Sequence, residues 1–246
     1  MKAAVTLTTN HSFAAGMKDG TTIALGYFPA AITFGFIAQT TGLTVQETML
    51  MSLLVFAGAA QYMALSLLAA GTGAIEIIFT TFIVNIRHFL MSASLNEKAV
   101  QDHPLKKAGY AFGLTDEVFA VASTKEGTVH TGYVYGVFFI SYASWVIHSG
   151  VGHAVGQLLP EMLQQSLAFA LYALFIALLA PSLKKHRKIF FLAALAAVLN
   201  SVFAFIMAEG WAIILATLIA ATVLEFIEPL NNKYNDADQK NGVERK

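Results

Sequence analysis

The chain has 246 residues, of which 57% are hydrophobic and 12% charged, and its formal net charge is zero. Because a soluble domain has an apolar share of roughly 45–50%, this composition and a mean hydropathy of +0.63 predict a membrane protein. The absence of cysteine excludes disulfides and thiolate metal sites. Basic residues are not clustered as a nucleic-acid surface requires, and we expect no metal, no cofactor and no nucleic-acid partner.

Seven segments are apolar and long enough to be spans, since a spanning helix needs about 20 mostly apolar residues. They cover 21–39, 48–70, 74–95, 131–150, 163–182, 188–207 and 211–228. The N-terminus lacks the continuous apolar region of a signal peptide, so we expect it to stay in the mature chain. The sequence therefore predicts an all-α polytopic integral membrane protein with one transmembrane domain over 1–228 and a polar, disordered cytoplasmic tail over 229–246.

Basic residues predict the orientation of these spans. Lys and Arg are frequent in the connection 96–130, in the sequence KKHRK at 184–188 and in the C-terminal tail. Because basic residues concentrate on the cytoplasmic side, we expect all three there, which puts the N-terminus outside if all seven segments cross. The rule is met equally well if the first segment, interrupted by GYFPA at 26–30, is re-entrant and the N-terminus lies inside.

The first three and the next three segments follow the same order of helix, uncharged turn, helix, connection and helix. The turn GFIAQTTGLTVQETML at 35–50 resembles GHAVGQLLPEMLQQSL at 152–167, and Asn85 has a counterpart in Asn200. A repeat offset by three spans must be inverted in the membrane, an arrangement that places transporter sites at the repeat interface. Repeats over 18–95 and 131–207, joined by the cytoplasmic segment 96–130, are one interpretation; chance resemblance between apolar helices is the other.

Polar residues interrupt the apolar sequence FIVNIRHFLMS at 82–92. At 100° per residue, Asn85 and His88 share one stripe of the helix and Arg87 lies on another. An Arg at this depth costs at least about 2.5 kcal/mol unless it faces a partner, a cavity or water. It either forms a structural ion pair with Asp116 or Glu117 of GLTDEVFA or binds an anionic group such as a substrate carboxylate. His88 is either a proton carrier or a neutral hydrogen-bonding residue.

Two earlier segments carry further polar or helix-breaking residues. In FAGAAQYMALS, small residues precede Gln61, whose amide bonds either a neighbouring helix or a ligand. In DGTTIALGYFPAAITFG, Pro29 removes a backbone donor and indicates either a simple kink or a break that lines a cavity. Discontinuous helices mark transporter sites, so the occurrence of Pro29 together with Gln61 and Arg87 makes the cavity as good an interpretation as the kink.

An intramembrane enzyme acting on a lipid-linked substrate through His88, Asp116 and Glu117 is a rival interpretation. The sequence has no H-E-x-x-H, no G-x-S-x-G and no D-x-x-D pair for a Mg-diphosphate. We therefore expect that the protein is not an enzyme. A non-transporting accessory membrane subunit is the third interpretation.

Four motifs occur in order along the first half of the chain: DGTTIALGYFPAAITFG, FAGAAQYMALSLL, NIRHFLMSASL and LTDEVFA. Together they resemble the AzlC-type branched-chain amino acid permease family, from about residue 18 to residue 116. The resemblance implies a multi-pass protein of the cell inner (cytoplasmic) membrane that exports leucine, isoleucine and valine, with methionine as a further candidate. It also implies proton antiport and a small hydrophobic AzlD-like membrane subunit as partner.

A zwitterionic amino acid needs a cation or helix N-terminus for its carboxylate, an acceptor for its ammonium group and an apolar pocket for its side chain. We predict that substrate is bound by Arg87, Gln61, Asn85, Pro29, Phe28 and Asn200. Phe34 and Phe56 are further candidates for the apolar pocket. We predict that His88, Asp116 and Glu117 serve proton coupling or gating.

Overall fold

The computed structural model describes residues 12–158, 160, 162–163, 166, 176, 180, 183–184, 187–208 and 210–224. These residues form helices and short connections, with one isolated bridge between Ala99 and Val129, so the all-α prediction is confirmed. Residue contacts divide the chain into two compact units. The first consists of Met1–Ala69 and Thr81–Leu174, and the second of Ala70–Thr80 and Phe175–Lys246.

Three helices are both long and apolar enough to cross a membrane: α1 (Phe13–Thr40), α4 (Ala74–Lys98) and α7 (Thr131–Val155). They confirm the predicted spans 21–39, 74–95 and 131–150, each of which the structure extends. The Ser12 side chain caps α1 by accepting a hydrogen bond from the Ala15 N–H. The helix then continues through Pro29, so of the two interpretations of Pro29 the break in the helix is wrong.

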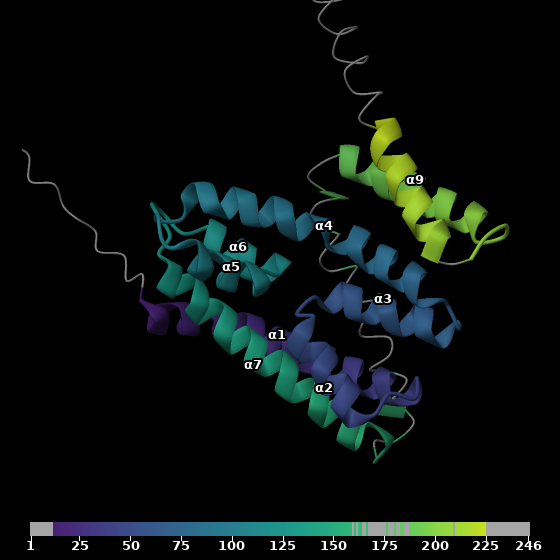
Figure 1. Cartoon of the computed structure of the whole chain (residues 1–246), viewed down its shortest axis with the longest axis horizontal. Helices are drawn as coiled ribbons and strands as arrows, with labels where there is room; N and C mark the ends of the chain where they lie inside the picture. The colour runs from purple at the N-terminus through teal and green to yellow at the C-terminus, as the bar shows by residue number, and fades with distance from the viewer. Residues whose placement is uncertain are drawn as a thin grey trace, which may run out of the picture. The chain divides into compact units, whose positions relative to one another are not determined.

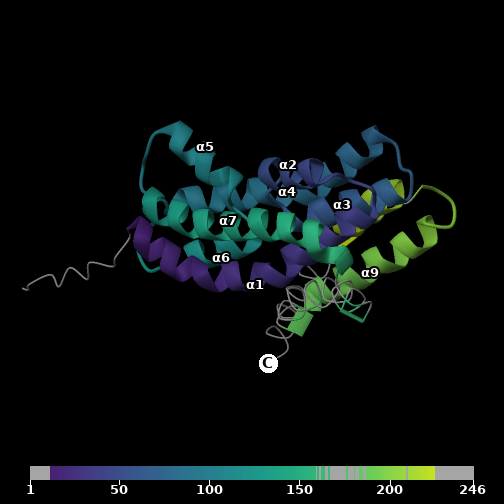
Figure 2. The same cartoon turned by 90° about the horizontal axis from the view of Figure 1, so that it is seen from below.

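α1 and α7 lie side by side and run in the same direction (Figure 1 and Figure 2). Near the start of both helices, a Cβ at Gly16 would overlap the carbonyl oxygen of Tyr133. Towards their ends, a Cβ at Gly35 would overlap the carbonyl oxygen of Ser149. Glycine thus lets the two backbones approach at both ends of a long parallel interface.

The predicted span 48–70 consists of two short helices, α2 (Val45–Leu54) and α3 (Gly58–Ala69), which we call the first hairpin. It starts where α1 and α7 end, since His153 donates a 2.8 Å hydrogen bond to the Leu43 carbonyl. Halfway along α7, the Tyr142 hydroxyl donates to the Leu53 carbonyl at 2.7 Å. The chain then reverses at 55–57, and α3 returns towards the end of α1 (Figure 1).

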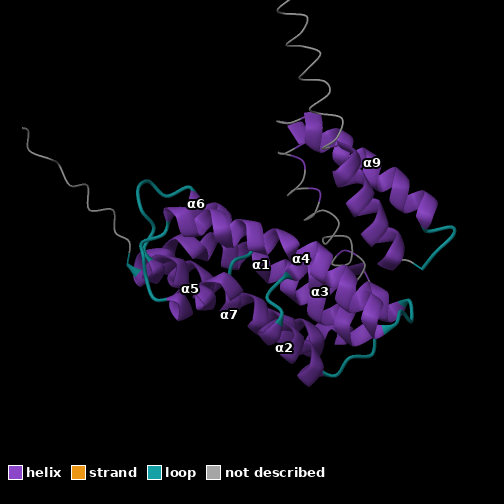
Figure 3. Cartoon of the chain, turned by 45° about the horizontal axis from the view of Figure 1, so that its top comes forward, coloured by secondary structure: helices purple, strands orange, loops and turns teal. Residues whose placement is uncertain are grey.

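The predicted cytoplasmic connection 96–130 contains a second hairpin, made of α5 (Pro104–Phe112) and α6 (Asp116–Ser123). It starts near the beginning of α7, where the Tyr135 hydroxyl donates to the Lys106 carbonyl at 3.0 Å. It returns to the beginning of α1, where Lys125 forms a 2.6 Å ion pair with Asp19. The second hairpin therefore enters from the end opposite to the first, and Figure 3 shows both connecting loops midway along the long helices.

Local capping explains where these short helices begin. Thr44 and Glu47 form a reciprocal capping box at the start of α2. α5 begins with Pro104 in its first turn, a position where the missing N–H has no cost. The Thr115 hydroxyl accepts from the Val118 N–H at the start of α6. The connections before these helices are therefore encoded locally, although their depth along α1 and α7 is not.

Every Lys of the first unit's described residues lies at or near the end where α1 begins, which we call the basic end: Lys18, Lys98, Lys106, Lys107 and Lys125. The connections 41–44 and 156–158 at the opposite end contain no basic residue. Lys98 ties the basic end together by donating to the carbonyls of Ser123 and Lys125. Here the His103 backbone N–H and the Lys106 ammonium hold the pKa of Asp102 below its usual range.

One feature of the predicted topology is corrected by this arrangement. α1 begins at the same end as the connection 96–130, since Asp19 near its start pairs with Lys125. The start of α1 and this connection are therefore not on opposite sides, as seven crossings require. The repeats over 18–95 and 131–207 remain a prediction, because much of the second one lies outside the described residues.

The second unit contains α9 (Arg187–Phe203) and a further apolar helix, Gly210–Leu224. They correspond to the predicted spans 188–207 and 211–228. Glu76 caps the latter helix by accepting a 2.9 Å hydrogen bond from the Trp211 N–H. Most of the predicted span 163–182, part of the basic sequence 184–188 and the tail from 229 lie outside the described residues.

Candidate functional site

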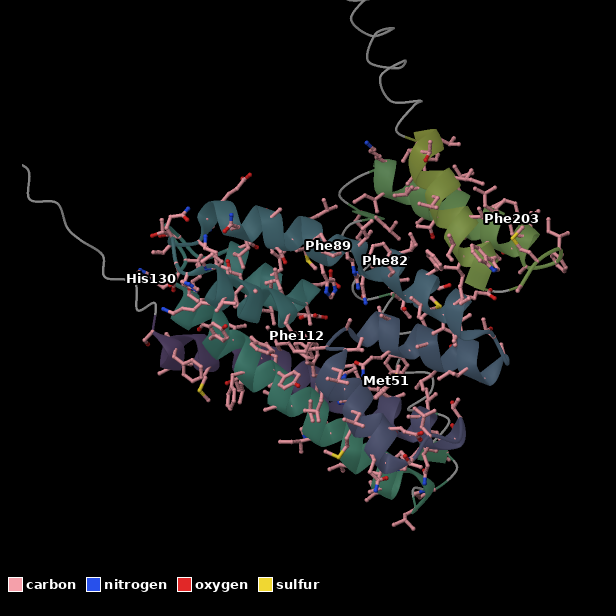
Figure 4. All side chains as sticks on the ribbon, viewed as in Figure 1. Met51, Phe82, Phe89, Phe112, His130 and Phe203 are labelled. Carbon is pink, nitrogen blue, oxygen red and sulfur yellow. The ribbon has the colours of Figure 1, made fainter. Side chains whose placement is uncertain are left out.

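The tips of the two hairpins meet near the middle of α7. Phe56 follows α2 and Phe112 ends α5, and both rings pack against Phe138 and Tyr142, with centroids 5.2–6.1 Å apart. Figure 4 shows Phe112 between His130, at the start of α7, and Met51 of the first hairpin. The two backbone reversals at 55–57 and 113–115 therefore share one aromatic contact region.

Arg87 of α4 lies at the same level and pairs with Asp116, the first residue of α6. Its Nη1 is 2.9 Å from Oδ2 of Asp116, and the two side chains are 45% and 34% exposed within the structure. The predicted ion pair is confirmed, with Asp116 rather than Glu117 as the partner. A guanidinium carries five N–H donors, and this pair is made through Nη1, so Arg87 has the capacity to bind an anion in addition to Asp116.

Glu117 is bound by Tyr27 of α1. The Tyr27 hydroxyl donates to Oε2 of Glu117 at 2.6 Å and lies 2.7 Å from the Thr115 hydroxyl. Since the single hydroxyl proton of Tyr27 goes to Glu117, Thr115 donates to Tyr27. Thr115 in turn accepts from the Val118 N–H at 3.3 Å. The result is a directed chain of hydrogen bonds that ends on the carboxylate, in which each bond polarises the next.

The hairpin junction, formed by Tyr27, Arg87, Asp116 and Glu117, carries an unequal number of charges. Arg87 pairs with Asp116, and within the described residues no Lys or Arg side chain pairs with Glu117. His88 of α4 lies within electrostatic reach of Arg87 and both carboxylates. With ionised carboxylates and neutral His88, the junction holds one positive and two negative charges and can accept one more cationic group.

Gln61 lies in a separate, fully buried network that fixes the first hairpin to α7. Trp145 donates through Nε1 to Oε1 of Gln61 at 2.9 Å, and Nε2 of Gln61 donates to Ser52 at 3.2 Å. Ser52 donates to Ser149 at 2.9 Å, and Ser149 donates to the Trp145 carbonyl at 2.7 Å. The amide thus bonds neighbouring helices, one of its two predicted roles.

The remaining predicted site residues are dispersed. Phe28 is 49% exposed, and its ring meets His148 of α7 at 4.8 Å. Pro29 lies on an exposed face of α1, and its carbonyl accepts from Thr33 at 2.8 Å. Asn200 belongs to α9 of the second unit, and none of these residues is joined to Arg87 by a described contact.

The amide of Asn85 is incompletely satisfied. Its Oδ1 is buried, and within the described residues it has no hydrogen-bond partner. The same is true of Oδ1 of Asn200. Both predicted asparagines therefore present acceptors that a donor from elsewhere can satisfy.

Sequence reasoning missed Tyr27, Thr115 and Trp145. Tyr27 lies in the sequence GYFPA, two residues before Pro29. Thr115 immediately precedes the acidic residues Asp116 and Glu117. A signal was present for each, because a tyrosine or tryptophan in an apolar helix usually needs a partner for its polar atom. The identity of that partner depends on the hairpin, which no local pattern reveals.

Comparison with known proteins places the sequence in a family. The family model described as AzlC protein matches residues 22–159. The inner membrane protein YgaZ of Escherichia coli K12 is 33% identical over 199 residues, 78% of this chain and 81% of the relative. An uncharacterized membrane protein of Archaeoglobus fulgidus is 35% identical over 174 residues, 70% and 76% of the two chains.

A further relative carries a functional name. The branched-chain amino acid transport protein AzlC of Bacillus subtilis is 25% identical over 169 residues, 68% of this chain and 66% of the relative. No solved structure matches the chain. The family match spans α1 to α7, and with it the hairpin junction. This multi-pass membrane protein therefore belongs to the AzlC family.

Proposed function

We propose that the protein is the large subunit of a transporter that exports branched-chain amino acids by proton antiport, together with a small AzlD-like membrane subunit. The class of function, membrane transport, is supported by membership of the AzlC family and by the name of the Bacillus subtilis relative. The substrates are leucine, isoleucine and valine, with methionine as a further candidate. The finer statements rest on the chemistry of the hairpin junction.

The observation that carries the proposal is the meeting of two interrupted helical segments at a charged cluster. The tips 55–57 and 113–115 approach from opposite ends and lie near the middle of the long helices. Irregular backbone at membrane depth is tolerated where protein or a water-filled cavity surrounds it. Discontinuous helices are the usual builders of substrate and ion sites in secondary transporters.

An amino acid matches the groups of this junction. The guanidinium of Arg87 suits the substrate carboxylate, because guanidinium and carboxylate form charge-assisted hydrogen bonds. Glu117 provides an anionic acceptor for the ammonium group. The rings of Phe56, Phe138 and Tyr142 offer apolar contact for a branched side chain. The ion pair with Asp116 keeps Arg87 in place when no substrate is bound.

The excess negative charge of the junction gives a route to antiport. When the substrate leaves, its ammonium group leaves one carboxylate without a cation, and a proton can restore the balance. Glu117 and Asp116 are the acceptors for that proton, and His88 lies within electrostatic reach of both. The ammonium group of the substrate and the proton compete for the same carboxylate. Outward movement of the substrate is therefore coupled to inward movement of the proton.

The direct test is efflux of preloaded radiolabelled leucine from cells that express the chain with and without the small AzlD-like protein. We expect efflux above an empty-vector control only when both proteins are present. A protonophore should abolish it, because the proton gradient then no longer drives exchange. The same assay is repeated with isoleucine, valine and methionine.

Each outcome of this assay is informative. Efflux that persists with the gradient collapsed rejects proton antiport, while efflux without the small protein rejects the two-subunit unit. Unchanged efflux of all four amino acids rejects the substrate class. Lys106→Gln is the matched control, because it removes a basic side chain at the basic end and leaves the hairpin junction intact.

A further inference from the structure

Tyr27 contacts both hairpins at once. On one side its ring meets the ring of Phe56 edge-on, with centroids 6.1 Å apart. On the other side its hydroxyl bonds Thr115 and Glu117 of the second hairpin. The ring also packs edge-on against Trp145 of α7 at 5.2 Å, and only 7% of the residue is exposed. One side chain of α1 therefore links the two tips to the long parallel helices.

The two contacts differ in kind, which allows them to be tested separately. The contact with Phe56 is apolar and depends on the ring alone. The contact with Glu117 depends on the hydroxyl alone, because the ring edge cannot donate a comparable hydrogen bond. Tyr27→Phe removes the second contact and keeps the first.

We propose that Tyr27 is a positioning residue that joins the two hairpin tips and orients Glu117 towards a cationic group, the ammonium group of the substrate or the coupling proton. The inference rests on the proposed function and assigns a role that no motif indicated. The hydrogen bond from Tyr27 fixes the direction in which the Glu117 carboxylate points, because it holds one carboxylate oxygen at 2.6 Å from the Tyr27 hydroxyl. Breaking this bond frees the second tip from α1 and lets the two hairpins move apart.

The titratable groups around Glu117 belong to three elements. Asp116 precedes it on α6, while Arg87 and His88 lie on α4. α1 contributes Tyr27. Among these groups, Tyr27 is the described hydrogen-bond donor to Glu117. Tyr27→Phe therefore removes a hydrogen bond to Glu117 without removing a charge from the junction.

The functional test compares the pH dependence of leucine efflux for Tyr27→Phe and Tyr62→Phe. Tyr62 is the matched control, because it is also buried and its hydroxyl donates at 2.6 Å to the Ala30 carbonyl of the same helix α1. We expect Tyr27→Phe to shift the pH of half-maximal efflux, because the carboxylate that we propose exchanges a proton then loses its hydroxyl donor. Tyr62→Phe should leave this pH unchanged.

A double substitution separates positioning from general destabilisation. In a Glu117→Gln background the carboxylate no longer titrates, so adding Tyr27→Phe should produce no further shift of the pH profile. A full additional shift would show that Tyr27 does not act through Glu117 and would overturn the proposal. Equal shifts with Tyr27→Phe and Tyr62→Phe would overturn it as well.

A second readout does not require transport. The chain contains no cysteine, so Ala57→Cys introduces one thiol at the buried tip of the first hairpin. We expect a membrane-permeant maleimide to label it several-fold faster when Tyr27→Phe is also present, and at the original rate with Tyr62→Phe. If wild-type protein exports no amino acid, the proposed function fails while this labelling still decides whether Tyr27 holds the tips together. An unchanged labelling rate with Tyr27→Phe would overturn the proposal that Tyr27 joins the two hairpin tips.

Discussion

At the scale of single residues, the polar side chains of the apolar helices differ in what they bind. Some form hydrogen bonds with neighbouring helices, whereas others are placed to bind a further group. Gln61 has its carbonyl oxygen and one N–H engaged in a buried network. Arg87 instead shares one nitrogen with Asp116 and is 45% exposed in the structure. A polar side chain with unused donors near the middle of a long apolar helix is costly, which makes Arg87 the better candidate for contact with substrate.

Arg87→Ala is expected to abolish leucine efflux while the protein remains in the membrane at its normal amount, because the substrate carboxylate loses its cation. Efflux and membrane protein level, measured on the same cells, check this prediction. Arg87→Lys keeps the charge but not the planar fork, so it should retain partial activity. A protein level that falls in step with activity, and recovers in the double substitution Arg87→Ala with Asp116→Ala, would instead indicate a structural ion pair.

At the scale of elements, the parallel pair of α1 and α7 forms the frame on which the hairpins are mounted. Its close contacts depend on glycines at chosen positions. A Cβ at Gly35 would overlap the Ser149 carbonyl oxygen, whereas a Cβ at Gly26 of the same helix meets nothing within 4 Å. Position along the helix, rather than residue type, therefore decides which glycine is needed for packing.

Gly35→Ala is expected to destabilise the protein by about 1–3 kcal/mol, the usual cost of overpacking a closely fitted interface. Gly26→Ala should stabilise the protein, because alanine is favoured over glycine by up to about 1 kcal/mol in a helix interior where space is free. Thermal unfolding of the purified protein in detergent, followed by tryptophan fluorescence, measures both. Equal midpoints for the two variants would contradict the close parallel packing of α1 and α7.

At the scale of the whole molecule, the first unit has one basic end and an opposite end whose described connections, 41–44 and 156–158, contain no Lys or Arg. The positive-inside rule puts the basic end in the cytoplasm. The start of α1 lies at this end, since Asp19 pairs with Lys125. Both hairpins enter and leave on their own side, so they add no crossing to the topology.

Single cysteines in the cysteine-free chain test this topology. We expect Lys18→Cys and Gln101→Cys to react with a membrane-impermeant maleimide only when the cytoplasmic face is exposed. Gln46→Cys, at the start of the first hairpin, should react from outside intact cells. Labelling of positions 18 and 101 from opposite faces would restore the seven-crossing scheme and contradict the arrangement of the hairpins.

Composition and local pattern alone determined the class of this protein. An apolar run of 18 or more residues has to be a membrane helix or a buried one, so the three long helices were predictable from their length. The ion pair of Arg87 was also predictable, because a guanidinium at membrane depth needs an anion, and Asp116 or Glu117 of GLTDEVFA was the predicted partner.

Only the tertiary structure decided that the segment 48–70 turns back at 55–57 and that part of 96–130 enters the bundle. An apolar run has the same hydropathy whether it crosses or reverses, so its depth is set by contacts with α1 and α7 that lie far away in the sequence. The same holds for Tyr27, whose partner became visible only when the second hairpin was placed beside α1. Most residues of the junction were thus predicted from the sequence as site residues. That they lie together at the hairpin tips was decided by the fold.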